Sequence, residues 1–230
     1  MKVTKFILIL IVFLLFIDIL SAHQPRLVYN LENSQNNPIM VQEPEISKAY
    51  YGELNGQPDY YMIKSEEKFN LYLSILSPDL EDSKTDFEVE VILDNNLFFV
   101  LNGSQKDWEV FHEEFAGDSY LDGPEIEKIV EPGIYYIKVS NPSNTGKYSL
   151  AVGKIESFPF KEIVKTFMVL PKLKKDFFEK SPLTAYFNLI GLFLLIFLVI
   201  TAGIVIGIIF VVKKLKKKKL KVKTKTIRKK

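Results

Sequence analysis

The sequence predicts a mainly β protein: an antiparallel β-sandwich followed by an amphipathic helix and one transmembrane helix. Residues 46–157 contain short runs in which apolar and polar side chains alternate, the pattern of strands that bury one face. No long helical pattern interrupts these runs before Phe158. Residues 185–212 carry no charged side chain, and this stretch exceeds the roughly 20 residues that a membrane-spanning helix needs.

Nine segments of this region have the composition and length of strands. In the segment that begins at Phe69, alternate residues such as Leu71 and Leu73 are apolar and the residues between them are mostly polar. The nine expected strands are residues 50–54, 59–64, 69–76, 87–93, 97–101, 108–111, 126–130, 135–139 and 148–152. Turns are expected at residues 94–96 and 141–146, which are rich in Asp, Asn, Pro and Gly. Many short strands with one apolar face each must pair those faces, which favours a β-sandwich.

The N-terminal residues 1–22 have the features of a signal peptide. Lys2 and Lys5 precede an apolar run over residues 6–17, and small residues before His23 offer a cleavage point. The run is shorter than a spanning helix, although an uncleaved anchor is the alternative. Residues 23–45 are rich in Asn, Gln and Pro and are expected to form an extended leader.

Charge is divided into zones along the chain. Residues 23–157 contain 10 Lys and Arg against 24 Asp and Glu, whereas the residues after 212 contain 12 Lys and Arg and no acid. An excess of Lys and Arg marks the cytoplasmic side of a membrane helix. We therefore expect a single-pass type I protein of the cell membrane, with the sandwich outside the cytoplasm and residues 213–230 as a basic cytoplasmic tail. The tail is predicted to bind anionic lipid head groups. Nucleic-acid binding is disfavoured, because a tail beside the bilayer reaches little else.

Residues 158–182 form a third zone. Apolar residues recur there at roughly helical spacing, with lysines between them. This pattern is typical of an amphipathic helix that lies in the membrane interface, and Pro171 is expected to kink or divide it. The alternative is that the apolar face packs on the sandwich.

Three short motifs in the expected sandwich stand out by their glycine, proline and tyrosine content. They are Tyr-Gly-Glu-Leu-Asn-Gly-Gln-Pro-Asp-Tyr-Tyr at residues 51–61, Glu-Pro-Gly-Ile-Tyr-Tyr-Ile-Lys-Val at 131–139 and Gly-Lys-Tyr-Ser-Leu-Ala-Val at 146–152. Their pattern resembles that of bacterial pre-peptidase C-terminal domains, over about residues 47–152. The resemblance implies a jelly-roll-like sandwich, usually a non-catalytic binding or secretion module of secreted enzymes. No peptidase precedes the motifs here, and residues 102–124 depart from the family pattern.

Few residues suit catalysis. The chain has no cysteine, which excludes thiol catalysis and thiolate metal sites. His112 is the histidine available within the expected sandwich, and no serine has a Gly-x-Ser-x-Gly context. We therefore expect a protein that is not an enzyme and that needs no organic cofactor.

The acidic and aromatic segment 108–127 is the best candidate for a binding site. Among its carboxylates, Glu113, Glu114 and Asp118 are predicted as possible Ca²⁺ ligands, because Ca²⁺ takes six to eight oxygen ligands. The spacing is not that of an EF-hand. The alternative is a solvated acidic loop that aromatic residues pin to the sandwich. Asp59 is expected to form hydrogen bonds at a turn or strand end rather than to bind a ligand.

Two further motifs are short. Gly203 and Gly207 have the spacing that lets two spanning helices approach closely, which predicts self-association through this face. Asn102 begins an Asn-Gly-Ser triplet that is a glycosylation acceptor in organisms that glycosylate secreted proteins.

These observations predict a membrane-anchored extracytoplasmic β-sandwich that binds a glycan or polypeptide without catalysing a reaction. The alternative function is an accessory subunit of a larger membrane complex, or an envelope cargo or secretion factor. Both follow from a binding-type domain held at a membrane with no catalytic constellation in its sequence.

Overall fold

The computed structural model describes residues 23–227 apart from residues 30 and 115. The signal peptide predicted over residues 1–22 lies outside the described residues, as do residues 228–230 of the tail. The chain divides into two compact units, the first ending at Ala185 and the second starting at Tyr186. Each unit is described by itself.

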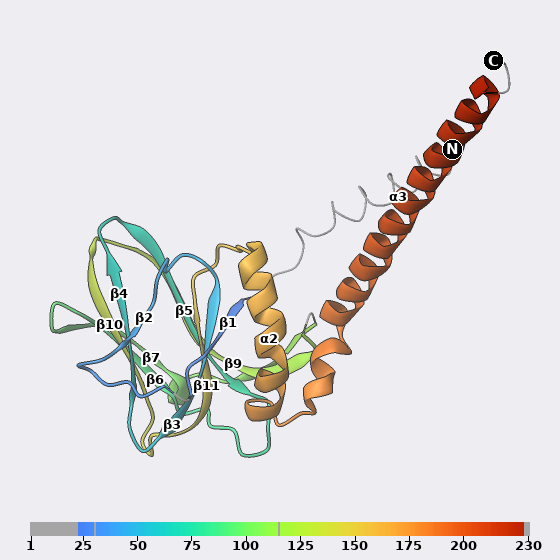
Figure 1. Cartoon of the computed structure of the whole chain (residues 1–230). Coiled ribbons are helices and arrows are strands. Elements are labelled where there is room, and N and C mark those ends of the chain that lie inside the picture. The colour runs from blue at the N-terminus through green and yellow to red at the C-terminus, as the bar shows by residue number, and fades with distance from the viewer. Residues whose placement is uncertain (1–22, 30, 115, 228–230) are drawn as a thin grey trace. The chain divides into compact units, whose positions relative to one another are not determined.

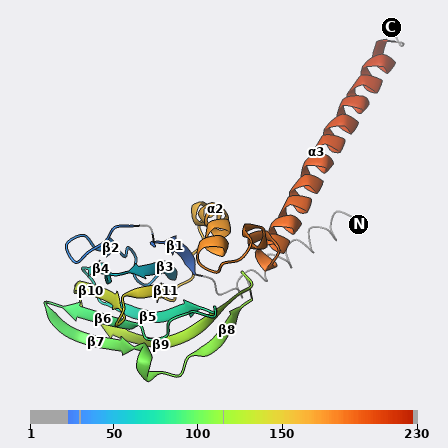
Figure 2. The same ribbon diagram turned by 90° about the horizontal axis from the view of Figure 1, so that it is seen from below.

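The first unit contains two β-sheets (Figures 1 and 2). One sheet has six strands in the order β1-β3-β11-β5-β9-β8, and the other has five in the order β2-β4-β10-β6-β7. The pairs β1–β3 and β2–β4 are parallel, and all other neighbouring strands are antiparallel. The strands are β1 (Gln24–Leu27), β2 (Ile39–Met40), β3 (Lys48–Asn55), β4 (Asp59–Ser65), β5 (Phe69–Pro78), β6 (Glu88–Leu93), β7 (Asn96–Asn102), β8 (Glu109–Glu113), β9 (Asp118–Val130), β10 (Gly133–Ser140) and β11 (Thr145–Val152). The predicted mainly β, antiparallel sandwich is confirmed.

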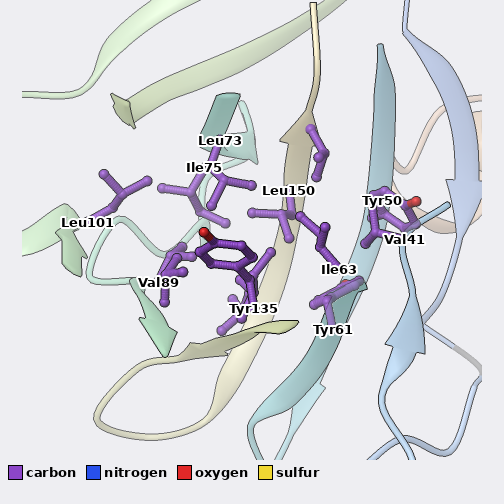
Figure 3. Packing of buried hydrophobic residues seen from close by; sticks show 14 of the residues in the cluster. Val41, Tyr50, Tyr61, Ile63, Leu73, Ile75, Val89, Leu101, Tyr135 and Leu150 are labelled. Carbon is purple, nitrogen blue, oxygen red and sulfur yellow. The ribbon is translucent and has the colours of Figure 1, made fainter. Parts of the chain in front are cut away.

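One hydrophobic cluster fills the space between the sheets (Figure 3). Alternate residues of the central strands enter it, among them Ile63, Leu73, Val89, Tyr135 and Leu150, and all of these are buried. Each such side chain contributes about 1.5–3 kcal/mol when it is withdrawn from water. Because the chain has no cysteine, this core takes the place of disulfides in stabilising the sandwich.

The structure contains the nine predicted strands and adds two more in the predicted leader. β1 pairs with β3 and β2 pairs with β4, and Val28 and Val41, which follow these strands, are buried in the core. Residues 23–45 are therefore part of the sandwich rather than a segment that precedes it. The two strands contain four and two residues, too few for an alternation to be recognised in the sequence.

Strand β9 begins earlier than predicted, at Asp118 instead of residue 126. Gly123 and Pro124 interrupt its alternation, and such residues within a run usually argue against a central strand. The pairing register with β5 shifts between Ser74 and Leu76, which accommodates this interruption. Gly123 lies where a Cβ would come within 2.6 Å of the ring of Trp108, so that ring packs directly on the backbone of β9.

The tight turn between β6 and β7 has the expected chemistry. Asp94 and Asn95 form the whole connection and both have positive φ angles, of 50° and 61°. Paired positive φ values are what a two-residue type I′ hairpin requires, and Asp and Asn tolerate them. The turn predicted at residues 94–96 is confirmed.

Helix α2 (Phe160–Asp176) belongs to the first unit and lies against strand β1 (Figure 1). Leu170, Leu173 and Lys174 are buried, as are Phe177 and Phe178 just beyond the helix. The helix is continuous through Pro171 and is not divided there. One face of this segment therefore packs on the sandwich. This is the second of the two possibilities that the sequence left open for residues 158–182.

The second unit consists mainly of helix α3 (Leu189–Ile227), which a short 3₁₀ turn, η3 (Pro182–Tyr186), precedes. Its stretch Leu189–Lys214 has a mean hydropathy of 3.2, and it is the one helix among the described residues that is long and apolar enough to cross a membrane. The helix starts four residues later than the predicted span of 185–212 and continues into the basic tail.

Candidate functional site

An exposed row of apolar side chains crosses the outer face of the five-stranded sheet. Pairing registers align one residue from each strand, in the order Met40 on β2, Met62 on β4, Tyr136 on β10, Ile92 on β6 and Leu97 on β7. Residues paired in register lie on the same side of a sheet. Leu97 is 61% exposed and Met40 47%, and the three central residues are half-buried. We call these five residues the apolar row.

The surroundings of the apolar row are mixed. On one side Ile134 is exposed and pairs with Lys64. On the other side, Lys138 Nζ lies 3.0 Å from Glu90 Oε2, and Val100 is exposed next to this ion pair. An apolar centre with charges at its margin is the usual anatomy of a protein-binding surface.

Alternation along the strands places the row on the outside. In β4 the neighbours of Met62 are Tyr61 and Ile63, both fully buried in the core, so the side chain of Met62 points away from it. Polar residues are expected at such outward positions of a sandwich. The row was missed in the sequence because it becomes visible only when the registers of five strands are known. One signal in the sequence could have indicated the row: Met62, Tyr136 and Ile92 are large apolar or aromatic residues at outward positions, where polar residues are expected.

The candidate segment 108–127 forms the β8–β9 hairpin and its approach. The ring nitrogen of Trp108 donates to the Gly103 carbonyl over 2.9 Å, and the Trp108 ring packs against the hydrophobic core. The rings of Phe111 and Tyr120 lie 6.5 Å apart, and Tyr120 also meets Phe178 at 5.1 Å. Aromatic side chains therefore attach this segment to the sandwich and to the end of α2. This agrees with the alternative prediction, an acidic loop that aromatic residues hold on the sandwich.

Asp118 lies in a buried ion-pair cluster. Lys174 Nζ is 2.6 Å from Asp118 Oδ2 and donates to the Ala116 carbonyl at 2.6 Å, while Lys180 Nζ is 3.0 Å from Asp118 Oδ1. The side chains of Lys174 and Asp118 are each 1% exposed. A Ca²⁺ ion would have to displace two ammonium groups from this carboxylate.

Of the other two predicted calcium ligands, Glu113 lies opposite Asp118 in the β8–β9 ladder. Glu113 Oε2 accepts from the Ala116 backbone N–H over 2.7 Å, and Glu114 is exposed. Among residues 23–227, apart from 30 and 115, no three Asp, Glu or His side chains are grouped so as to hold a metal ion. The calcium site at Glu113, Glu114 and Asp118 stays a prediction, and the structure favours an ion pair as the role of Asp118.

Two further carboxylates of the hairpin have structural partners. Glu125 accepts from the Tyr72 hydroxyl at 2.7 Å, and Glu127 lies 2.6 Å from Lys154 Nζ. Burial raises the pKa of Asp122; the charge of Lys106 opposes this shift, and the charges of Glu125 and Glu109 add to it. Glu125 and Glu127 therefore have hydrogen-bond or ion-pair roles within the sandwich.

Asp59 joins the two sheets through hydrogen bonds, as predicted for a residue at a strand end. The Tyr148 hydroxyl donates to Asp59 Oδ2 at 2.5 Å and lies 2.7 Å from the Tyr61 hydroxyl, and Asn33 Nδ2 donates to Asp59 Oδ1 at 2.7 Å. Burial raises the pKa of Asp59, although the two donors oppose this shift. The ring of Tyr148 occupies the space over Gly52, where a Cβ would come within 2.4 Å of it.

Four other residues noted in the sequence have simple surroundings. His112 is exposed on β8, with its Nδ1 3.1 Å from the Ser119 hydroxyl. The side-chain oxygen of Asn102 accepts from the Ser104 backbone N–H over 3.0 Å and caps a 3₁₀ turn. Gly203 and Gly207 lie in α3, and nothing comes within 4 Å of a Cβ added at either position.

The fold defines a class: a two-sheet β-sandwich whose chain continues into one helix long and apolar enough to cross a membrane. Among solved structures, the chain is similar to the pre-peptidase C-terminal domain of a collagenase from Bacillus anthracis, with 16% identity over 54% of this chain and 97% of that domain and a TM-score of 0.33. It is also similar to a cycloisomaltooligosaccharide glucanotransferase from Paenibacillus sp., with 16% identity over 51% of this chain and 16% of that protein and a TM-score of 0.24.

A third similar structure is the insecticidal crystal protein Cry2Aa, with 10% identity over 53% of this chain and 24% of that protein and a TM-score of 0.27. No family model and no curated protein matches this chain. The resemblance that the sequence motifs indicated, to pre-peptidase C-terminal domains, thus recurs among the solved structures. Likeness at this level of identity concerns the fold alone.

Proposed function

We propose that this protein is a membrane-anchored, non-enzymatic binding module whose sandwich lies outside the cytoplasm and binds a polypeptide through the apolar row. The exposed row on the outer face of the five-stranded sheet is the observation that carries the proposal. Sandwich strands that face water normally present polar side chains outward, and a contiguous exposed apolar patch marks an interaction surface.

The composition of the row favours a polypeptide over a glycan. Sugar rings stack best on flat aromatic faces, whereas Met62, Ile92 and Leu97 provide flexible or branched aliphatic contacts. Methionine in particular adapts to irregular apolar partners. Tyr136, at the centre of the row, supplies an aromatic anchor of the kind that dominates protein interfaces.

The anchoring part of the proposal is supported by α3 and by the charge zones. The span Leu189–Lys214 suits a bilayer in length and hydropathy, and the residues after 212 are basic without an acid. The non-enzymatic part is supported by the sequence, which has no cysteine and two histidines. No cofactor is part of the proposal.

Photo-crosslinking in native membranes tests this proposal. A photoreactive side chain at Leu97 should form a discrete adduct with one polypeptide, and Tyr136→Asp should abolish the adduct without changing the melting temperature. The matched control is the same photoreactive group at Val110, which is equally exposed but lies on β8 of the other sheet. No adduct from Leu97, or equal adducts from both positions, would contradict the proposal.

The same experiment separates the two forms of the function. A soluble extracytoplasmic polypeptide as the partner supports a binding module, whereas an integral membrane protein supports an accessory subunit of a larger complex. Glycan binding by the full chain that Tyr136→Asp abolishes, without a polypeptide adduct, selects a glycan ligand instead. Turnover of a peptide or glycan that His112→Ala abolishes would overturn the non-enzymatic assignment.

A further inference from the structure

Helix α2 exposes a second apolar stripe, separate from the face that packs on the sandwich. Phe160, Val164 and Met168 follow one another at four-residue intervals, so they lie along one side of the helix. Phe160 is 80% exposed and Met168 is 69% exposed, and Val164 is also exposed. In contrast, Leu170 and Leu173 are buried. Packing on the sandwich therefore accounts for one apolar face of α2 and leaves the stripe Phe160–Val164–Met168 in solvent.

The charges of α2 are sorted between the same two sides. Its first acid, Glu162, lies 2.9 Å from Arg26 on β1, and its last, Asp176, accepts from the Tyr29 hydroxyl over 3.0 Å. Beyond the helix, Glu179 lies 2.7 Å from Lys147 on β11. The three acids of residues 158–185 thus all have partners on the sandwich. Lys161, Lys172 and Lys175 are exposed, and of these Lys172 also places its Nζ 5.5 Å from the centre of the Tyr29 ring. The outer side of α2 is consequently apolar and basic, on a domain that is otherwise acidic.

The attachment of α2 keeps this outer side in a constant orientation on the sandwich. Ion pairs and hydrogen bonds hold the helix near both ends, at Glu162 and Asp176. Near its C-terminus the buried pair between Lys174 and Asp118 adds a further contact. Rotation of the helix would break this pair and leave a buried charge without its partner. The stripe is thus presented by a fixed helix rather than by a mobile arm.

Chain connectivity brings this unit close to the proposed anchor. The first unit ends at Ala185 and α3 begins at Leu189, so the intervening residues can span at most about 15 Å even when fully extended. If α3 anchors the chain, as proposed above, the part of the sandwich at which the chain leaves is held at the membrane surface.

We propose that the outer side of α2, with the stripe Phe160–Val164–Met168 and Lys161, Lys172 and Lys175, binds the anionic lipid surface of the leaflet on the sandwich's side of the membrane. An apolar stripe flanked by lysines is the composition of helices that lie in the interface of an anionic bilayer. The acidic sandwich is repelled by such a surface, so the basic helix determines which side of the domain meets it. A second copy is a poorer occupant, because two such stripes in contact would bring their lysines together.

Site-directed spin labelling of the full chain tests this inference, because the chain has no native cysteine. Val164→Cys and Met168→Cys carry the label on the stripe, and Leu97→Cys carries it on the apolar row as the matched control. The chain is reconstituted in vesicles of phosphatidylcholine alone or mixed equally with phosphatidylglycerol. In the mixed vesicles we expect the stripe labels to be accessible to oxygen and protected from a water-soluble nickel complex, while the label at position 97 stays accessible to the complex in both.

Charge reversal identifies the source of the protection. Lys161→Glu, Lys172→Glu and Lys175→Glu together should abolish it, whereas reversal of the exposed lysines Lys64, Lys106 and Lys128 should leave it intact. Stripe labels that stay accessible to the nickel complex in mixed vesicles would overturn the inference. Equal protection in neutral vesicles would overturn the anionic assignment, and protection that rises with protein density would assign the stripe to a second copy.

Alkaline carbonate extraction of the same vesicles separates this inference from the anchor on which it rests. A chain that carbonate removes is not anchored, and the proposed function then fails. A chain that resists extraction while its stripe stays in water leaves the anchor intact and overturns the lipid contact alone.

Discussion

Lys174 and Asp118 show how a charged residue can belong to a core. Lys174 lies on the face of α2 that the sequence pattern marks as polar, because lysines alternate there with the apolar residues. In the structure it is buried, and its ammonium group donates to the carboxylate of Asp118 and to a backbone carbonyl. The sequence predicted Asp118 as a possible calcium ligand, and it placed Lys174 among the lysines of an amphipathic helix. Their partnership depends on a contact between residues far apart in the chain, which no local pattern reveals.

The first prediction concerns this pair. Lys174→Met should lower the free energy of unfolding by about 3–5 kcal/mol, because it leaves a buried carboxylate with less of its compensating charge. Denaturant unfolding of the full chain in micelles, followed by the fluorescence of its single tryptophan, measures the change. Lys175→Met, at an exposed neighbouring position, is the control and should change stability by less than about 0.5 kcal/mol. Equal midpoints for the two variants would show that the buried pair contributes no stability.

At the scale of elements, hydrogen bonds across the sandwich connect strands of different sheets. Asp59 and Tyr61 lie on β4 of the five-stranded sheet, and Tyr148 lies on β11 of the six-stranded sheet. The sequence motifs contain all three residues, and Asp59 lies at the start of β4, in agreement with the strand-end position predicted for it. The bond between Asp59 and Tyr148 connects two of the three motifs that resemble pre-peptidase C-terminal domains, those at residues 51–61 and 146–152.

This connection predicts a pH dependence of stability. Because burial raises the pKa of Asp59, the folded chain binds that proton more tightly than the unfolded chain does. The resulting stabilisation is present below the ordinary pKa of 3.8 and is lost as the pH rises through the raised value. Asp59→Asn does not titrate, so its stability relative to the wild type should increase across this window.

Thermal unfolding of the full chain followed by circular dichroism across the acidic range measures that difference. Tyr148→Phe is the companion variant: it removes a donor that lowers the pKa of Asp59, so it should extend the pH-dependent window upward. A difference between Asp59→Asn and the wild type that stays constant with pH would contradict the prediction.

The strands and helices differ in how well local patterns predicted them. Strands such as β5 and β10 alternate clearly and were predicted within a few residues of their observed bounds. β1 and β2 are too short to alternate, and β9 is interrupted by Gly123 and Pro124, so pairing with neighbours rather than local composition determines them. For α2, the periodicity identified a helix but not which of its sides packs on the sandwich.

At the scale of the whole molecule, the division of charge is the dominant feature. Residues 23–157 are strongly acidic and the residues after 212 are strongly basic, while the apolar span lies between them. This arrangement predicts the orientation of the chain, because translocation of a segment dense in lysine and arginine is disfavoured.

Orientation can be measured by protease protection in intact and permeabilised cells. The wild-type sandwich should be digested in intact cells, and replacing Lys213, Lys214, Lys216 and Lys217 by Gln should increase the fraction of chains whose sandwich is protected. Replacing Lys64, Lys84, Lys106 and Lys128 of the sandwich by Gln is the control and should leave orientation unchanged. A sandwich that is protected in intact wild-type cells would contradict the orientation.

The sequence by itself determined the features that depend on local order: nine alternating strands, the Asp94–Asn95 turn, an amphipathic helix, an apolar stretch of spanning length and the zones of charge. Each arises from interactions between residues close along the chain or from composition alone. The tertiary structure decided the rest, because these features depend on register and on contacts between distant segments. It buried Lys174 against Asp118, placed the leader within the sandwich and aligned Met40, Met62, Tyr136, Ile92 and Leu97 across five strands. Single residues in separate strands form a surface only once the strands are paired.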